Sequence, residues 1–250
     1  MKRSTIIILS IILFTNCSSD KVKTCHLSGH LIDRDSKILI LKKQAEDNPG
    51  IGTEINIDSS GHFDYDLNFQ FLEAYELIFK DELDKGAWRP ILIFPDNDKI
   101  ELTLYPFEKA DSNKIVGSEL SLKESEFYKM IIKKQNEQDA LWRQKMDSTS
   151  ILNFDVSDTK SNETMFDAMQ TIVKELPFLE FENCVKEQNN IYGYSKLLSI
   201  LKTEKDHGLL EIDSLKKYCD LFEQNFPNHP YNKIAQSRFN ELMDKSVDNY

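Results

Sequence analysis

The spacing of apolar residues changes abruptly at Gly117, and this change limits the fold more than any other feature. Before it, apolar and polar residues alternate in short runs, as in His62–Leu67, where Phe63, Tyr65 and Leu67 share one face. A period of two is typical of half-buried strands. After Gly117, apolar residues recur at three and four, which is typical of helices with one buried face. The sequence therefore predicts an α+β chain.

The first part is predicted to be an antiparallel β-sandwich or a barrel-like domain, because many short strands follow one another without helices between them. Turn-forming residues, such as Ser60-Gly61 and Pro95–Asp98, separate nearly all of the runs. The expected strands are Cys25–Ile32, Lys37–Leu41, Thr53–Ile57, His62–Leu67, Ala74–Phe79, Arg89–Phe94, Ile100–Leu104 and Lys114–Val116.

The second part is predicted to be an α-helical bundle, because each of its segments has a single apolar face. A polar stretch from Asp147 to Asn162 is expected to be an exposed loop. Pro177 is expected to stop or kink one helix, and Asp213 and Pro230 are expected to begin two others. The expected helices are Leu120–Met146, a segment through Met165–Leu176, Tyr192–Leu201, one after Asp213 and one after Pro230.

The N-terminal segment has the features of an export signal: Lys2 and Arg3, an apolar run at Ile6–Phe14, then Cys17. Nine residues make about 14 Å of helix, too short to cross a hydrocarbon core of about 30 Å. The segment resembles a bacterial lipoprotein signal, in which Cys17 would carry the lipid. An ordinary secretory signal with Cys17 as a plain thiol is the alternative.

The expected organisation follows from these features. Residues 1–16 would be the signal peptide, 17–24 a flexible tether, 25–118 the β domain and 119–250 the helical domain. The protein is then expected in the bacterial cell envelope, anchored in the outer membrane on its periplasmic or its surface face. Its partners would be the membrane, through the lipid on Cys17, and an envelope protein or glycan.

The net charge of −11 disfavours nucleic acid as a partner, because an acidic chain repels polyanions and this one has no stripe of Lys and Arg. Lipidation of Cys17 would leave Cys25, Cys184 and Cys219. An odd number argues against a disulfide framework. Cys184 and Cys219 fall on apolar helix faces, so we expect small buried thiols, with a Cys184–Cys219 disulfide as the alternative.

Catalytic motifs are absent from the sequence, which contains no Gly-x-Ser-x-Gly, no phosphate-binding loop, no His-Glu-x-x-His and no Cys-x-x-Cys. His26 and His30 are four residues apart on an expected strand, which separates their rings by about 13 Å, too far to share an ion unaided. We therefore expect no catalytic residue, no metal site and no cofactor. Trp88 and Trp142 are weak candidates for contact with a partner, with core packing as the alternative.

Several short motifs resemble a domain of unknown function that stands at the N-terminus of TlpA-type thioredoxin-like thiol-disulfide oxidoreductase lipoproteins. They are Leu27-Ser28-Gly29, Asp58–Phe63, Ala74–Leu77, Phe94–Ile100 and Val116-Gly117-Ser118, with Val185–Asn190 and Phe226–Tyr231 resembling the helical segment that follows. In that family a thioredoxin-like domain with Trp-Cys-x-x-Cys comes next. The sequence contains no such motif, so the resemblance implies no redox activity for this chain.

Three functions are compatible with these observations. The first is a non-catalytic envelope lipoprotein that binds a protein or glycan. The second is an accessory to a periplasmic thiol-disulfide system, in which Cys25, Cys184 or Cys219 exchanges disulfides with another protein. The third is an enzyme whose site is assembled from distant residues.

Overall fold

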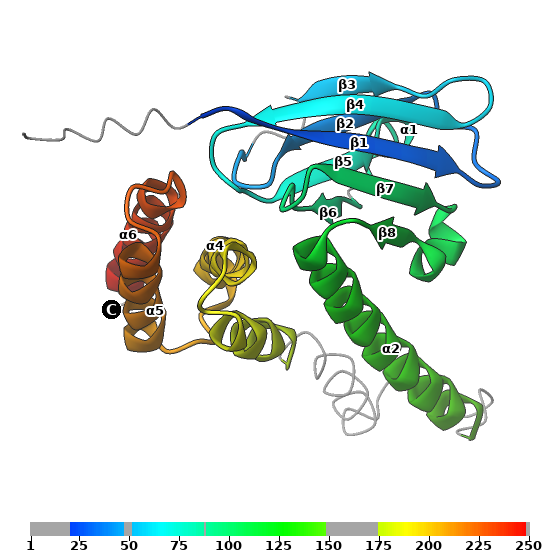
Figure 1. Ribbon diagram of the computed structural model, residues 1–250. Coiled ribbons are helices and arrows are strands. Elements are labelled where there is room, and N and C mark those ends of the chain that lie inside the picture. The colour runs from blue at the N-terminus through cyan, green and yellow to red at the C-terminus, as the bar shows by residue number, and fades with distance from the viewer. Residues whose placement is uncertain (1–20, 48–51, 88, 149–174, 249–250) are drawn as a thin grey trace, which may run out of the picture.

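The computed structural model describes residues 21–47, 52–87, 89–148 and 175–248 (Figure 1). It confirms the α+β class, with two four-stranded sheets and several helices. All eight expected strands are present, within three residues at each end: β1 (Lys23–Leu31), β2 (Ile38–Lys43), β3 (Thr53–Asn56), β4 (His62–Phe69), β5 (Tyr75–Phe79), β6 (Ile91–Ile93), β7 (Lys99–Leu104) and β8 (Lys114–Val116).

The strands form two separate sheets with orders β4-β1-β7-β8 and β3-β2-β5-β6, and the described strands do not close into a barrel. The barrel-like alternative is therefore wrong. The purely antiparallel prediction is also wrong, because β1 pairs with β7 in parallel, with Leu27 opposite Ile100. Between these two strands the chain crosses to the other sheet and returns twice, first through β2 and β3 and then through β5 and β6, and β7 lies beside β1 in the same direction.

One apolar core is built from both sheets, as the alternation along each strand requires. In β4, Phe63, Leu67 and Phe69 are buried and Tyr65 is half-buried. The predicted turn before β4 forms around Asp58, whose carboxylate accepts hydrogen bonds from the backbone N–H groups of Ser60 and His62 at 2.8 and 2.9 Å. This turn fixes where β4 begins.

The helices follow the strands, apart from a short α1 (Lys80–Leu83) and a 3₁₀ helix η1 (Phe107–Ser112) that the sequence did not suggest. The predicted loop at Asp147–Asn162 is wrong for its first two residues, which belong to α2; the rest of it, and residues 165–174, lie outside the described residues. Pro177 does not end its helix, because it lies within the helical run at 175–186. The long helices are α2 (Glu119–Ser148), α4 (Ile191–His207), α5 (Ile212–Asn225) and α6 (Tyr231–Asp248).

Helix starts are set partly by residues other than those expected. Asp213 lies in the first turn of α5, whose N-cap is Glu211, with no side-chain capping bond. Asp213 there still places a negative charge near the positive end of the helix dipole. Asn190 caps α4 through its side chain, which accepts a hydrogen bond from Gly193 N–H at 3.1 Å. Pro230 directly precedes α6, close to its predicted position.

Helix α4 is the centre of a second apolar core, and nearly all of its residues from Ile191 to Leu201 are buried. It packs against α5 and α6 (Figure 1). Two residues next to strands, Ala74 and Phe94, belong to this core as well. The helical core is therefore continuous with the outer side of the sheet that contains β5 and β6.

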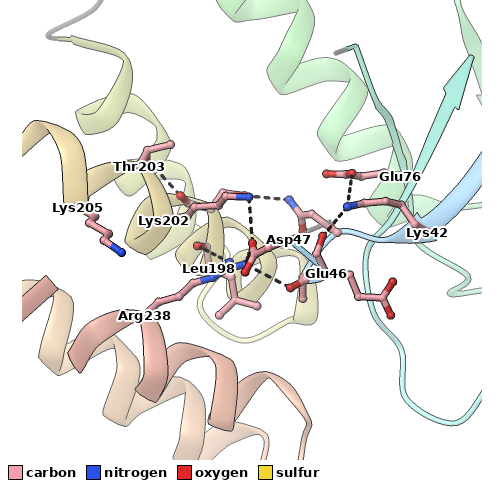
Figure 2. A network of polar contacts seen from close by, with 12 residues as sticks. Lys42, Glu46, Asp47, Glu76, Leu198, Lys202, Thr203, Lys205 and Arg238 are labelled. Carbon is pink, nitrogen blue, oxygen red and sulfur yellow. Dashed lines mark hydrogen bonds and ion pairs between the residues drawn. The ribbon is translucent and has the colours of Figure 1, made fainter. Parts of the chain in front are cut away.

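A polar seam joins the end of β2 to α4 and α6 (Figure 2). Arg238 of α6 has a nearly buried side chain, which donates to Leu198 O at 3.0 Å and pairs with Asp47 at 2.9 Å. Lys202 of α4 pairs with the same Asp47 carboxylate at 3.0 Å. Burial alone would raise the pKa of Asp47, but these two cations hold it below its usual value. The seam therefore fixes the loop after β2 on the helices.

His229 lies where the sheets meet α6. Its Nε2 is 3.0 Å from Leu72 O, and the N–H of Tyr231 donates to its Nδ1 at 3.2 Å. Burial lowers the pKa of His229, helped by nearby Lys43 and opposed by the Leu72 carbonyl and by Glu73. The neutral ring is thus the form that fits the folded chain.

The contribution of His229 to the free energy of unfolding is expected to fall as the pH is lowered from 7.5 to 5.5, because the unfolded chain takes up a proton on residue 229 before the folded chain does. The His229→Gln variant should be less stable at pH 7.5, but its free energy of unfolding should depend less on pH. The slopes of the two chains should differ by at most about 1.4 kcal/mol per pH unit. Urea unfolding at three pH values measures both slopes. Because the remaining histidines are common to both chains, equal slopes would contradict this account.

Candidate functional site

A cavity of about 310 Å³ lies between strands β6 and β8, the 3₁₀ helix η1 and the start of α2. Its volume is at the lower end of the range for small-ligand sites. Apolar and aromatic side chains form most of the wall, and a few charged groups interrupt them. The lining includes Phe79, Ile91, Leu92, Tyr105, Phe107, Ile115 and Tyr128.

Arg34 forms one side of the cavity and is held there by several contacts. Its guanidinium lies 3.3 Å from the centre of the Phe79 ring and pairs with Glu82 at 2.9 Å. Its Nε–H donates to Ser36 Oγ at 2.8 Å, and that hydroxyl donates to Asp81 at 2.7 Å. Only 9% of the side chain is exposed. The charge of Arg34 is therefore neutralised within the protein.

Arg89 also lines the cavity and repeats the stacked arrangement with another ring. Its guanidinium lies 3.3 Å from the centre of the Phe107 ring, in η1. Arg89 is exposed, and none of the described carboxylates forms an ion pair with it. A guanidinium that covers a ring with its face keeps its edge N–H groups available for other partners.

Glu124 of α2 contributes a carboxylate to the wall, but a cation inside the protein neutralises its charge. Both of its oxygens bind the Nζ of Lys196, a buried residue of α4, at 2.8 and 2.6 Å. Burial raises the pKa of neighbouring Glu180, and the Glu124 charge adds to this, while Lys196 opposes it. The interior side of the cavity is thus a buried charged cluster that supports α2.

The mouth of the cavity exposes large apolar side chains. Phe107 is 45% and Tyr128 47% exposed, and both line the cavity. Exposed apolar groups that surround a concave site are typical of binding surfaces. The cavity is therefore the strongest candidate for a binding site among the described residues.

The sequence-based site residues fall mostly outside this region. Cys17 lies outside the described residues, as does Trp88, although its neighbours Arg89 and Pro90 line the cavity. Trp142 lies in α2, but its side chain is outside the described part of the chain. The cavity residues were missed because they come from distant segments and form no local motif, as Arg34, Arg89 and Glu124 show.

The three described cysteines are free thiols, and the structure shows no bond between Cys184 and Cys219. Burial raises the pKa of Cys25 to about 11, with the charges of Asp96 and Asp98 adding to it. Burial also raises the pKa of Cys184 and of Cys219 to about 12. At neutral pH these groups stay protonated, whereas disulfide exchange needs the thiolate.

A serine, a histidine and an aspartate meet at the turn before β4, but in an order unsuited to catalysis. Ser60 Oγ donates to Asp58 at 2.7 Å and lies 2.9 Å from Nδ1 of His62. In a catalytic triad the histidine stands between the serine and the carboxylate. Here the serine stands between them, and the Asp58 carboxylate is occupied by the turn.

His26 and His30 have separate neighbours, on one half-buried face of β1. His26 lies between Asp64 and Asp66 of β4, at 3.2 and 2.8 Å, and His30 packs on the ring of His62. Within the described ranges, no three His, Cys, Asp or Glu side chains gather as a metal-ligand set. None of the helices described combines the length and apolar content needed to cross a bilayer.

Comparisons with known proteins add nothing to this geometry. No family model, no curated protein and no solved structure matches the chain. The assignment of function therefore depends on the chemistry of the residues alone.

Proposed function

We propose that this protein is a bacterial envelope lipoprotein, anchored by Cys17, that binds an envelope protein or glycan and does not catalyse a reaction. Its strands would form a β-sandwich module and its helices a bundle, as in the N-terminal part of TlpA-type lipoproteins. The observation that carries the proposal is the order Lys2-Arg3, apolar run, Cys17. The outer membrane is the proposed site of anchorage.

The cavity supports a binding role more than a catalytic one. Its described lining contains guanidinium groups, rings and aliphatic side chains, but no histidine and no cysteine. Its two carboxylates, Glu82 and Glu124, are both engaged by internal cations. Such groups can hold and orient a ligand, but the lining lacks an evident nucleophile paired with a base.

A redox accessory is the second candidate, and the thiols argue against it. Cys25 and Cys184 are fully buried, and Cys219 is half-buried against the helical core. Their raised pKa values leave little thiolate at neutral pH. The binding role therefore remains the better supported of the two.

The Cys17→Ser variant is expected to lose the lipid and, with it, attachment to the membrane. Cells grown with radiolabelled palmitate should yield a labelled wild-type chain in the membrane fraction and an unlabelled Cys17→Ser chain. A Cys219→Ser chain is the matched control, because it removes a thiol and keeps position 17. An unlabelled, freely soluble wild-type chain would contradict the proposal, and so would label retained by Cys17→Ser.

A further inference from the structure

The cavity between β6, β8 and α2 has an excess of positive charge, although the whole chain has a net charge of −11. Three cations and two carboxylates line it, namely Arg34, Arg89 and Lys129 against Glu82 and Glu124. Each of the two carboxylates already has a cation within the protein. In an acidic protein, a site with this balance selects against cations and in favour of anions.

The internal pairings determine which cations remain available. Glu82 neutralises Arg34, and Lys196 neutralises Glu124 from behind the wall. Arg89 and Lys129 have no ion-pair partner among the described residues, and both are exposed at the cavity. They are therefore the two cations that an incoming anion would meet first.

Arg89 is also arranged for directional contact. Phe107 supports one face of its guanidinium at 3.3 Å, which leaves the N–H groups at the edge as donors. A guanidinium edge matches the two oxygens of a carboxylate or a phosphate in a bidentate pair. Apart from Asn113 and Ser125, the uncharged part of the wall is aliphatic or aromatic, including Ile91, Leu92 and Ile115, and suits an apolar body.

We infer that this cavity binds a small ligand in which a single oxyanion group, a carboxylate or a phosphate, is attached to an apolar body. Arg89 holds the oxyanion, with Lys129 beside it, and the apolar body lies against β6, β8 and Tyr128. The inference rests on the proposed function as a binding protein and names the chemistry of what enters its site.

Three naphthalene derivatives of similar shape test the inference: 2-naphthoate, 2-naphthyl phosphate and neutral 2-naphthamide. Calorimetric titrations use the full chain in nanodiscs of zwitterionic phospholipid, with empty nanodiscs as the blank. Saturable binding of 2-naphthoate or 2-naphthyl phosphate is expected, at least about tenfold tighter than binding of the amide. The stronger of the two anions tells a carboxylate site from a phosphate site.

The Arg89→Gln variant should lower the affinity for the preferred anion at least about tenfold and leave the affinity for the amide unchanged. Lys114→Gln is the matched control, because it removes one positive charge in β8 next to the site without lining the cavity. It should change neither affinity by more than about twofold. Circular dichroism spectra of both variants establish that each one folds.

Three results would overturn the inference: no saturable binding of any of the probes, binding of the amide as tightly as the anions, or unchanged anion affinity in Arg89→Gln. Titrating the Cys17→Ser chain in solution as well makes the test of the cavity independent of the anchor. Anion binding by a wild-type chain that the palmitate experiment finds unlabelled would retain the cavity inference and overturn the anchor. A labelled, membrane-bound wild-type chain that binds no anion would retain the anchor and overturn the cavity inference.

Discussion

Replacing Gly117 with alanine is expected to lower the free energy of unfolding by about 3–5 kcal/mol. Gly117 connects β8 to α2 with a φ of 92°, a backbone conformation that residues with a side chain rarely adopt. A Cβ atom there would lie 2.2 Å from the carbonyl oxygen of Lys99. Because that oxygen belongs to the backbone of a paired strand, it cannot move aside cheaply.

Gly86→Ala is the matched control for this substitution. Gly86 also has a positive φ, of 78°, but a Cβ there would meet no atom within 4 Å. It should therefore cost only the conformational penalty, about 1 kcal/mol. Urea unfolding followed by circular dichroism measures both variants. Equal losses of unfolding free energy in the two variants would contradict a steric conflict between a side chain at position 117 and β7.

Replacing Tyr194 with alanine is expected to cost about 3–5 kcal/mol as well, because it opens a cavity in the centre of the helical core. The Tyr194 side chain is fully buried and stacks on Phe222, with ring centres 4.8 Å apart. The Tyr231 ring meets it edge-on at 5.4 Å. Its hydroxyl donates to the side chain of Asn232 at 2.7 Å.

Tyr194→Phe separates the hydroxyl from the ring. It keeps the contacts with Phe222 and Tyr231 and removes only the hydrogen bond to Asn232, so the expected loss is about 1 kcal/mol. The same urea titration compares the two variants. If alanine were tolerated as well as phenylalanine, packing of this ring could not be what stabilises α4 against α5 and α6.

Much of the fold could be predicted because it depends on local patterns. The alternation in His62–Leu67 and the turn at Ser60-Gly61 located β4 to within two residues, and the other strands followed in the same way. The parallel pairing of β1 with β7 could not be predicted, since spacing within a strand carries no information on which strand lies beside it. The N-cap of α5 was misplaced because Asp213 suits both the cap and the first turn.

The cavity could not be predicted for a similar reason. Arg34 precedes β2, Arg89 precedes β6 and Glu124 lies in α2, so only the folded chain brings them to one wall. An arginine stacked on phenylalanine also leaves no mark in the sequence, because the two members of each pair are far apart: Arg34 with Phe79, and Arg89 with Phe107. The residue type of Trp88 suggests contact with a partner, whereas it is the adjacent Arg89 that lines the cavity.

Ala74 and Phe94 lie next to strands but pack in the helical core, so separating the strands from the helices would expose them. A chain cut between Ser118 and Glu119 would place these two apolar side chains in water. It would also remove the Tyr231 hydroxyl that accepts the hydrogen bond from Ala74 N–H, at 2.7 Å, and leave that buried donor without its partner. Each fragment would then expose groups that are buried in the whole chain. Strands and helices are therefore best expressed together on one polypeptide.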